Sequence, residues 1–143
     1  MKFEDPQPPI TLEDLSDAEA ELGLKLPADL KATYLKANGG QPNPYVFENE
    51  DLDTVVNEFL ALRQSTHGRA EDTYRLLVRD RRLVPANFFP FAVDGAGDYF
   101  FVDTATDHGA VYFYRSDSPV EDRLLDLKVG VREFWSRLKA EDA

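Results

Sequence analysis

The sequence contains no cysteine, and it has no long apolar run. The first absence excludes disulfide bonds, thiolate metal ligands and a cysteine nucleophile, and it is typical of proteins in a reducing compartment. The second excludes a membrane-spanning helix, which needs about 20 apolar residues. The opening segment, MKFEDPQPPI, also lacks the apolar core of a secretory signal. We therefore expect a cytoplasmic protein that makes no membrane contact.

Positive charge is scarce as well. Lysine and arginine total 16 against 27 aspartate and glutamate residues, which gives a formal net charge of −11. Because contacts to phosphate need cations, we expect no direct binding of nucleic acid. A negative potential instead favours encounter with basic proteins. The simpler alternative is that the charge only keeps the protein soluble.

Groups arranged for catalysis are also missing. His67 and His108 both fall in polar segments, far apart in the sequence, and no serine lies in a nucleophile elbow. We therefore expect no catalytic residues, no cofactor and no enzyme activity.

Four aspartates fall close together in the sequence, at Asp94, Asp98, Asp103 and Asp107. Carboxylates on glycine-containing turns can converge on Ca²⁺, but this spacing departs from the EF-hand pattern. Aspartate and glycine are also the ordinary residues of hairpin turns. We therefore expect turns here and no metal site.

The stretch from Phe88 to Tyr114 is the most informative part of what is present. It holds three aromatic-rich apolar runs, separated by two polar connections that contain glycine: Phe88–Val93, Tyr99–Val102 and Ala110–Tyr114. Aromatic and β-branched residues suit strands, and aspartate and glycine suit turns. The pattern predicts a three-stranded antiparallel meander, one face of which must be covered by the remaining segments.

Helices are predicted in the sequence both before and after this meander. The first is capped by Thr11 and ends at Gly23, although a capping box at Ser16 allows a later start. The second is led by Leu26-Pro27 and stopped by Asn38-Gly39-Gly40. The two others run from about Ala70 to Asp80, with an arginine-rich face that we expect to be solvated and paired with carboxylates, and from Val131 to Leu138.

The other segments give weaker signals. Residues 1–9 are expected to form an extended lead-in, and the prolines of Gln41–Pro44 argue against regular structure there. Short strands are expected at Tyr45–Phe47 and Arg123–Leu127. Residues 55–62 fit either a strand or a helix, because periodicity cannot decide for so short a run.

Several of these segments together resemble the signatures of a known family. The Leu-Pro-led helix closed by Asn-Gly-Gly comes first, followed by Val84–Asp94, then Gly97-Asp98 and Gly109–Tyr112. Val131–Phe134 resembles the family's closing helix. In this order, from roughly Ile10 to Leu138, the segments resemble the SUKH superfamily, which takes its name from the fungal SMI/KNR cell-wall regulators. The residues that carry the resemblance are Leu26, Pro27, Asn38, Gly39, Gly40, Pro85, Phe91, Gly97 and Gly109.

The resemblance implies a fold and a class of function. The fold is α+β: a single domain over residues 1–143, in which an antiparallel sheet of about five or six strands packs against N-terminal, middle and C-terminal helices. It also implies that residues 55–62 form a strand. Bacterial members of the family are immunity proteins that bind and neutralise toxins, often nucleases or deaminases. Fungal members are signalling scaffolds, and neither role requires catalysis.

The expected partner is therefore a protein. It is a polymorphic toxin domain if the chain is an immunity protein, and a regulatory partner if the chain is a signalling scaffold. We expect the toxin's active site to be occluded by a preformed surface. The residues expected to contribute are the turn aspartates Asp94, Asp98, Asp103 and Asp107, with Tyr99 and Tyr112 as aromatic anchors.

Overall fold

A computed structural model describes residues 1–66 and 68–141 of the chain. Within these residues the strands are β1 (Lys2–Glu4), β2 (Gln41–Asn43), β3 (Val46–Glu48), β4 (Asp53–Phe59), β5 (Phe88–Asp94), β6 (Tyr99–Asp103), β7 (Ala110–Tyr114) and β8 (Leu124–Gly130). The helices are α1 (Leu12–Leu22), α2 (Ala28–Lys36), α3 (Ala70–Tyr74), the π-helix η1 (Arg75–Asp80), the 3₁₀-helix η2 (Val120–Asp122) and α4 (Val131–Ser136). The α+β class is confirmed.

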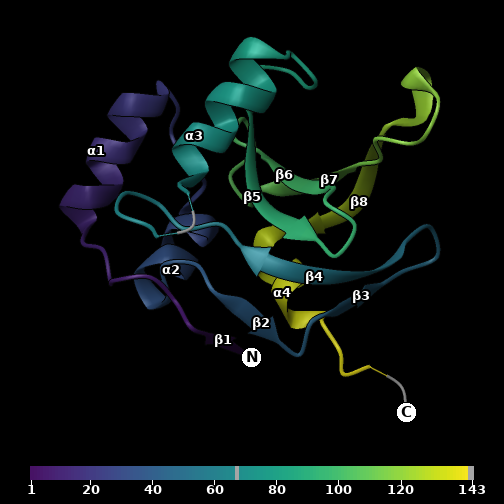
Figure 1. Ribbon diagram of the computed structural model, residues 1–143, viewed down its shortest axis with the longest axis horizontal. Helices are drawn as coiled ribbons and strands as arrows, with labels where there is room; N and C mark the ends of the chain where they lie inside the picture. Colours follow the sequence, from purple (N-terminus) through teal and green to yellow (C-terminus); the bar gives the residue numbers. More distant parts are fainter. Residues whose placement is uncertain (67, 142–143) are drawn as a thin grey trace.

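The main sheet has six antiparallel strands in the order β3-β4-β5-β6-β7-β8 (Figure 1). Spatial order equals chain order, so each strand pairs with the next along the chain. The predicted meander is confirmed as β5, β6 and β7. Residues 55–62, ambiguous from periodicity, contribute β4, which confirms the strand that the family resemblance implied.

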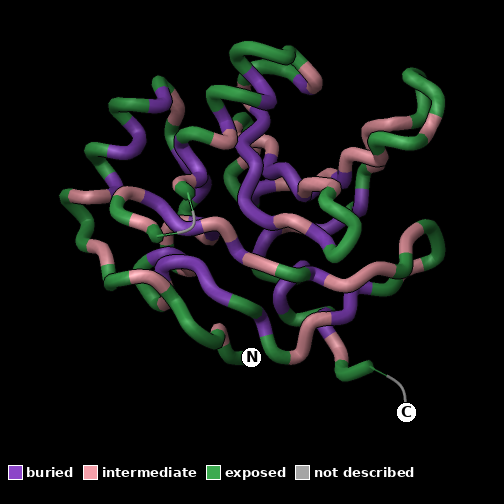
Figure 2. Tube along the Cα trace, viewed as in Figure 1, coloured by how far each residue is buried: buried purple, intermediate pink, exposed green. Residues whose placement is uncertain are grey.

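One face of this sheet carries the helices. Phe100 pairs with Phe113 across β6 and β7, and both side chains point to this face. The ring of Phe134 in α4 lies 5.0 Å from that of Phe100, and the ring of Tyr74 in α3 lies 6.2 Å from that of Phe89. Figure 2 shows the resulting core, with buried positions along the central strands and on the sides of the helices that face them.

The N-terminal helices begin and end largely as the sequence predicts. The Thr11 hydroxyl accepts a hydrogen bond from the Asp14 N–H at 3.1 Å, and the Asp14 carboxylate accepts one from the Thr11 N–H at 2.9 Å. This capping box confirms the earlier of the two possible starts. Gly23 ends α1 in the left-handed conformation with φ of 71°. Pro27 lies one residue before α2 begins.

One expectation was wrong. Gln41–Asn43 was expected to be irregular, but it pairs with Lys2–Glu4 of the N-terminal lead-in, as the antiparallel strands β2 and β1. The fixed φ of proline is compatible with an extended strand, and Phe3, opposite Pro42, packs its ring 5.1 Å from Phe59. A partner some forty residues away thus decides the local structure, which propensity alone cannot anticipate.

The middle helix also differs from its prediction. It is α-helical only over Ala70–Tyr74 and continues as a π-helix over Arg75–Asp80. A period of 3.6 residues does not signal this widening. Among the described residues, no helix is long and apolar enough to cross a membrane.

Candidate functional site

The second face of the sheet presents a group of half-buried aromatic residues. Alternation places Phe101 and Tyr112, which pair across β6 and β7, opposite the helix-bearing face. The register of the neighbouring strands places Tyr99, Tyr114 and Leu124 beside them. We call this surface the tyrosine face and define it as Tyr99, Phe101, Tyr112, Tyr114 and Leu124. Phe101 is fully buried, whereas the three tyrosines and Leu124 are partly exposed.

Carboxylates border the tyrosine face. Asp126 pairs directly with Tyr112, and Glu58 pairs with Val93, which in turn pairs with Tyr99. Burial, followed by the negative charges of Asp126 and Asp103, raises the pKa of Tyr112. The phenol therefore stays neutral at physiological pH and is available as a hydrogen-bond donor beside a negative rim.

The predicted site residues Asp94 and Asp98 lie in the β5–β6 turn, but they differ in exposure. Asp94 is buried, and its Oδ1 accepts hydrogen bonds from the N–H groups of Ala96 at 3.0 Å and Asp98 at 2.8 Å. Its Oδ2 accepts one from the Thr54 hydroxyl at 2.8 Å. Asp94 thus builds the turn and ties it to β4, while Asp98 is half-exposed and accepts a hydrogen bond from Ser116.

Asp103 and Asp107 lie at the other end of β6, in the β6–β7 connection. Asp103 accepts hydrogen bonds from the Asn87 side chain at 2.6 Å and from the Ala105 N–H at 2.9 Å, whereas Asp107 is exposed. The four aspartates therefore form two separate pairs with the tyrosine face between them. No group of three or more His, Asp or Glu side chains is arranged to hold a metal ion in residues 1–66 and 68–141. His67 lies outside the described residues.

Asn38-Gly39-Gly40 is a junction between three segments. The buried Asn38 amide donates to the carbonyls of Pro8 and Leu62 at 3.1 and 3.0 Å, and its oxygen accepts from the Leu62 N–H at 2.8 Å. Gly39 has φ of 82°, and a Cβ there would lie 2.9 Å from the Cβ of Ala61. At Gly40, with φ of 113°, a Cβ would lie 2.6 Å from the Glu4 carbonyl oxygen. Only glycine fits at both positions.

The other residues that carry the family resemblance also have packing roles. A Cβ at Gly109, where φ is 68°, would meet Val102 at 2.8 Å, Val131 at 3.0 Å and Pro27 at 3.3 Å, so this glycine lets β7 approach α4 and α2. Leu26 is buried, and Phe91 is fully buried with its ring 5.5 Å from Phe134. Two others shape turns, since the Pro85 carbonyl accepts from the Phe88 N–H at 3.0 Å and Gly97 has φ of 92°.

These features agree with the comparison against protein-family models. The model of the SMI1 / KNR4 family (SUKH-1) matches residues 9–134. The chain belongs to this family. A comparison with curated proteins gives no match. The SUKH resemblance drawn from the sequence is thereby confirmed over most of the chain.

This SUKH-family chain also contains a cluster of charged side chains that no sequence motif predicts. Glu21 on α1 pairs with Arg63, Arg69 and Arg75 at 3.0, 2.8 and 3.1 Å. Asp72 on α3 pairs with Arg69 and Arg75 at 3.0 Å each. The hydrogen bond from Arg69, with the positive charges around it, lowers the pKa of both Glu21 and Asp72. Paired carboxylates were expected for this arginine-rich segment, and Arg69 and Arg75 bear this out.

Beneath this cluster lies the fully buried Glu71. It accepts a hydrogen bond from the Arg63 N–H at 2.9 Å and forms ion pairs with Arg63 at 3.4 Å and Arg69 at 3.6 Å. Arg79 donates to the Leu22 carbonyl at 2.8 Å and stacks over Tyr74. The cluster thus links α1 to α3 and η1. Because its arginines and carboxylates form ion pairs with one another, they indicate a structural role.

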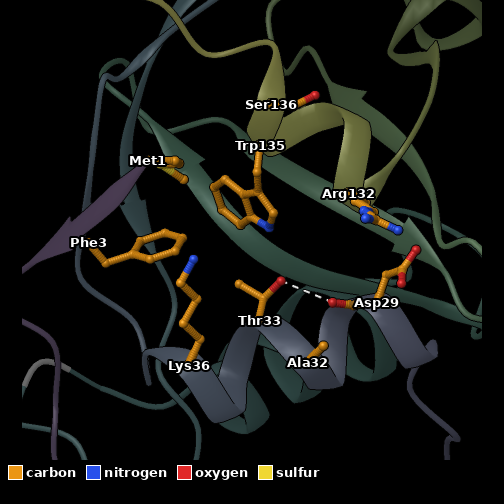
Figure 3. Close-up of a pocket in the computed structure, with 9 residues that line it drawn as sticks. All are labelled: Met1, Phe3, Asp29, Ala32, Thr33, Lys36, Arg132, Trp135 and Ser136. Atoms are coloured by element: carbon orange, nitrogen blue, oxygen red, sulfur yellow. Dashed lines mark hydrogen bonds between the residues drawn. The ribbon is translucent and has the colours of Figure 1, made fainter.

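A groove of about 450 Å³ lies between β1, α2 and α4 (Figure 3). Its apolar wall is formed by Met1, Phe3, Ala32 and Trp135, and the Phe3 and Trp135 rings meet edge to face with centroids 5.0 Å apart. Charged side chains of Asp29, Lys36 and Arg132 line its rim. The sequence analysis missed this groove, because the N-terminal strand that completes it was not predicted.

Proposed function

We propose that this SUKH-family chain is a non-enzymatic binding protein, and specifically a bacterial immunity protein that neutralises a toxin domain by covering its active site with the tyrosine face. The observation that carries the proposal is the tyrosine face itself: partly exposed tyrosines on a rigid sheet, between two aspartate-bearing turns, in a chain of net charge −11. Tyrosine is enriched at the centre of protein interfaces, and carboxylates complement a basic cleft.

The proposed mechanism is steric and electrostatic. Toxins that act on nucleic acid carry cationic clefts, because they must bind phosphate. The carboxylates that border the tyrosine face, Glu58, Asp98, Asp107 and Asp126, would face those cations, while Tyr99, Tyr112 and Tyr114 bury their rings against apolar surface. The six-stranded sheet beneath them is held by the aromatic core, so little conformational entropy would be lost on binding.

The direct test is co-expression with the toxin encoded beside this chain. We expect the chain to restore growth of cells that produce that toxin and to co-purify with it as a stoichiometric complex. Failure of both measurements with each neighbouring product would refute the immunity role and favour the regulatory scaffold.

Variants locate the contact surface. Tyr99→Ala combined with Glu58→Lys changes the tyrosine face and its acidic border. Neither side chain forms a hydrogen bond or ion pair with another residue of 1–66 and 68–141, so the fold is expected to persist. We expect a loss of affinity of about 100-fold or more, since central tyrosines are frequent hot spots. Asp17→Lys on α1 is the matched charge-reversal control, exposed and remote from the sheet. Equal binding by the two variants would place the interface elsewhere.

A further inference from the structure

The groove between β1, α2 and α4 holds a buried donor without an acceptor. Trp135 is more than nine-tenths buried, and its indole Nε1 has no hydrogen-bond partner among the described residues. Figure 3 shows the indole at the centre of the groove, with Nε1 turned toward the α2 side. A buried donor left unpaired is costly, and native proteins rarely retain one without a reason.

Two cations flank this donor. Lys36 on α2 and Arg132 on α4 line opposite sides of the groove, both are exposed, and neither takes part in an ion pair among residues 1–66 and 68–141. In this respect they differ from Arg63, Arg69 and Arg75, each of which forms an ion pair with Glu21 or Asp72. Asp29 is the single carboxylate that residues 1–66 and 68–141 contribute to the lining, so their local charge there is positive in a chain that is strongly negative overall.

The size and lining of the groove fit a small ligand. Its volume of about 450 Å³ lies within the range of small-molecule sites, which combine apolar walls with a few placed polar groups. Here the apolar walls are Met1, Phe3, Ala32 and the Trp135 ring. The polar groups are the Trp135 N–H donor, the Lys36 and Arg132 cations, the Asp29 carboxylate and the Thr33 and Ser136 hydroxyls. A ligand that has an apolar body and an anionic hydrogen-bond acceptor at one end would match both the apolar walls and the N–H donor with its two neighbouring cations.

We propose that this groove binds an apolar carboxylate, with the carboxylate accepting a hydrogen bond from Trp135 Nε1 and lying between Lys36 and Arg132, and the apolar body packed on Phe3. Such a carboxylate can be a free acid or the C-terminal residue of a peptide. The proposal does not depend on the immunity role, because the groove is built from β1, α2 and α4 and the tyrosine face from β6, β7 and β8.

The chain contains its own reporter, because Trp135 is the only tryptophan. Its single indole N–H resonance and its fluorescence can be followed while phenylacetate, decanoate or acetyl-Ala-Ala-Phe with a free C-terminus is added. We expect a saturable downfield shift of the indole N–H with a Kd of about 1 mM or below for at least one probe. Binding of phenylacetate or decanoate identifies a free acid, and binding of the peptide alone identifies a C-terminus.

Neutral analogues and exposed-residue variants test the assigned contacts. Phenylacetamide and the amidated peptide should bind about tenfold more weakly or not at all, because the charge-assisted contacts are lost. Lys36→Gln and Arg132→Gln should each weaken binding about five- to tenfold, whereas Lys25→Gln, an exposed lysine outside the groove, should leave it unchanged. Ala32→Phe should fill the groove and abolish binding, with the unfolding transition preserved because Ala32 is exposed.

Three results would overturn the proposal. The first is an indole N–H resonance that none of the three acid probes moves at concentrations well above about 1 mM. The second is equal affinity for the acid and its amide, since a groove that binds only through apolar contacts would not distinguish the carboxylate from the amide. Loss of binding in Lys25→Gln equal to that in Lys36→Gln would likewise show that net charge, and not the groove, is being measured.

Discussion

Asp94 shows at the scale of one residue how a carboxylate predicted to bind a partner can instead hold a turn together. Its two oxygens accept three hydrogen bonds, two of them from backbone N–H groups of its own turn and one from Thr54 on β4. Asp94→Ala would leave these donors without their acceptor. We expect the free energy of unfolding to fall by about 2–3 kcal/mol, measured by urea denaturation.

Two further substitutions serve as comparisons for this measurement. Asp94→Asn keeps one acceptor oxygen for the turn and should cost less than Asp94→Ala. Asp107→Ala removes an exposed aspartate from the other connection. Its side chain forms no hydrogen bond or ion pair within the described part of the chain, so stability should change by no more than about 0.5 kcal/mol. If Asp94→Ala were as stable as Asp107→Ala, the turn would not depend on this carboxylate.

At the scale of elements, the two-stranded sheet of β1 and β2 depends on one side chain. Phe3 packs its ring against Phe59 and Trp135, with centroids 5.1 and 5.0 Å away. Phe3→Ala should therefore loosen β1, reduce the free energy of unfolding by about 2 kcal/mol and shift the Trp135 fluorescence to longer wavelength. Lys2→Ala, on an exposed neighbour in the same strand, should do neither. An unchanged emission maximum in Phe3→Ala would mean that β1 does not shield the indole.

The contact between α1 and α3 leads to a prediction about pH. The pKa of Glu21, ordinarily near 4.5, is lowered by the hydrogen bond from Arg69 and by nearby positive charge, and the pKa of Asp72, ordinarily near 3.8, is lowered for the same reason. A carboxyl whose pKa is lower in the folded state contributes stability above its unfolded pKa and loses it as the pH falls. Stability should therefore decline as the pH drops below about 4.5, where Glu21 is half protonated in the unfolded chain but still largely ionised in the folded one.

Glu21→Gln separates this contribution from the rest of the acid response. The variant should lose about 1 kcal/mol or less at pH 7, because the pairs are partly exposed, and should match the native chain more closely in acid. Thermal unfolding between neutral and acidic pH measures both effects. Asp17→Asn is the control, because Asp17 is an exposed α1 carboxyl that forms no ion pair among residues 1–66 and 68–141. A constant difference between Glu21→Gln and the native chain at every pH would contradict the assignment.

The elements that sequence reasoning anticipated are those determined by neighbouring residues. The capping box at Thr11, the turn at Gly23 and the alternating strands of the meander all have local causes. The β1–β2 pair, the charge cluster around Glu21 and the Trp135 groove each join segments that are distant in sequence. Thr54, which ties the Asp94 turn to β4, is an example of a residue whose role becomes visible only when the strands are paired.

At the scale of the whole molecule, the charge of −11 bears on the rate of association more than on the fold. If the partner is a basic toxin domain, its encounter with this chain should be steered over about 30 Å at 0.01 M salt but only about 8 Å at 0.15 M. We expect the association rate constant to fall about tenfold or more between these conditions, with a much smaller change in the dissociation rate constant. Stopped-flow mixing of the two proteins measures the first and competition the second.

Position as well as total charge should matter in this experiment. Glu58 and Asp107 form no ion pair with any other described residue. Glu58→Lys combined with Asp107→Lys changes the net charge to −7, because each substitution adds two units to −11. A double reversal at Asp17 and Glu13, both exposed on α1, gives the same total far from the tyrosine face. The first variant should slow association more than the second, because potential near the contact surface dominates steering. Equal slowing would mean that the chain attracts its partner only by net charge, and a rate independent of salt would remove the electrostatic part of the mechanism.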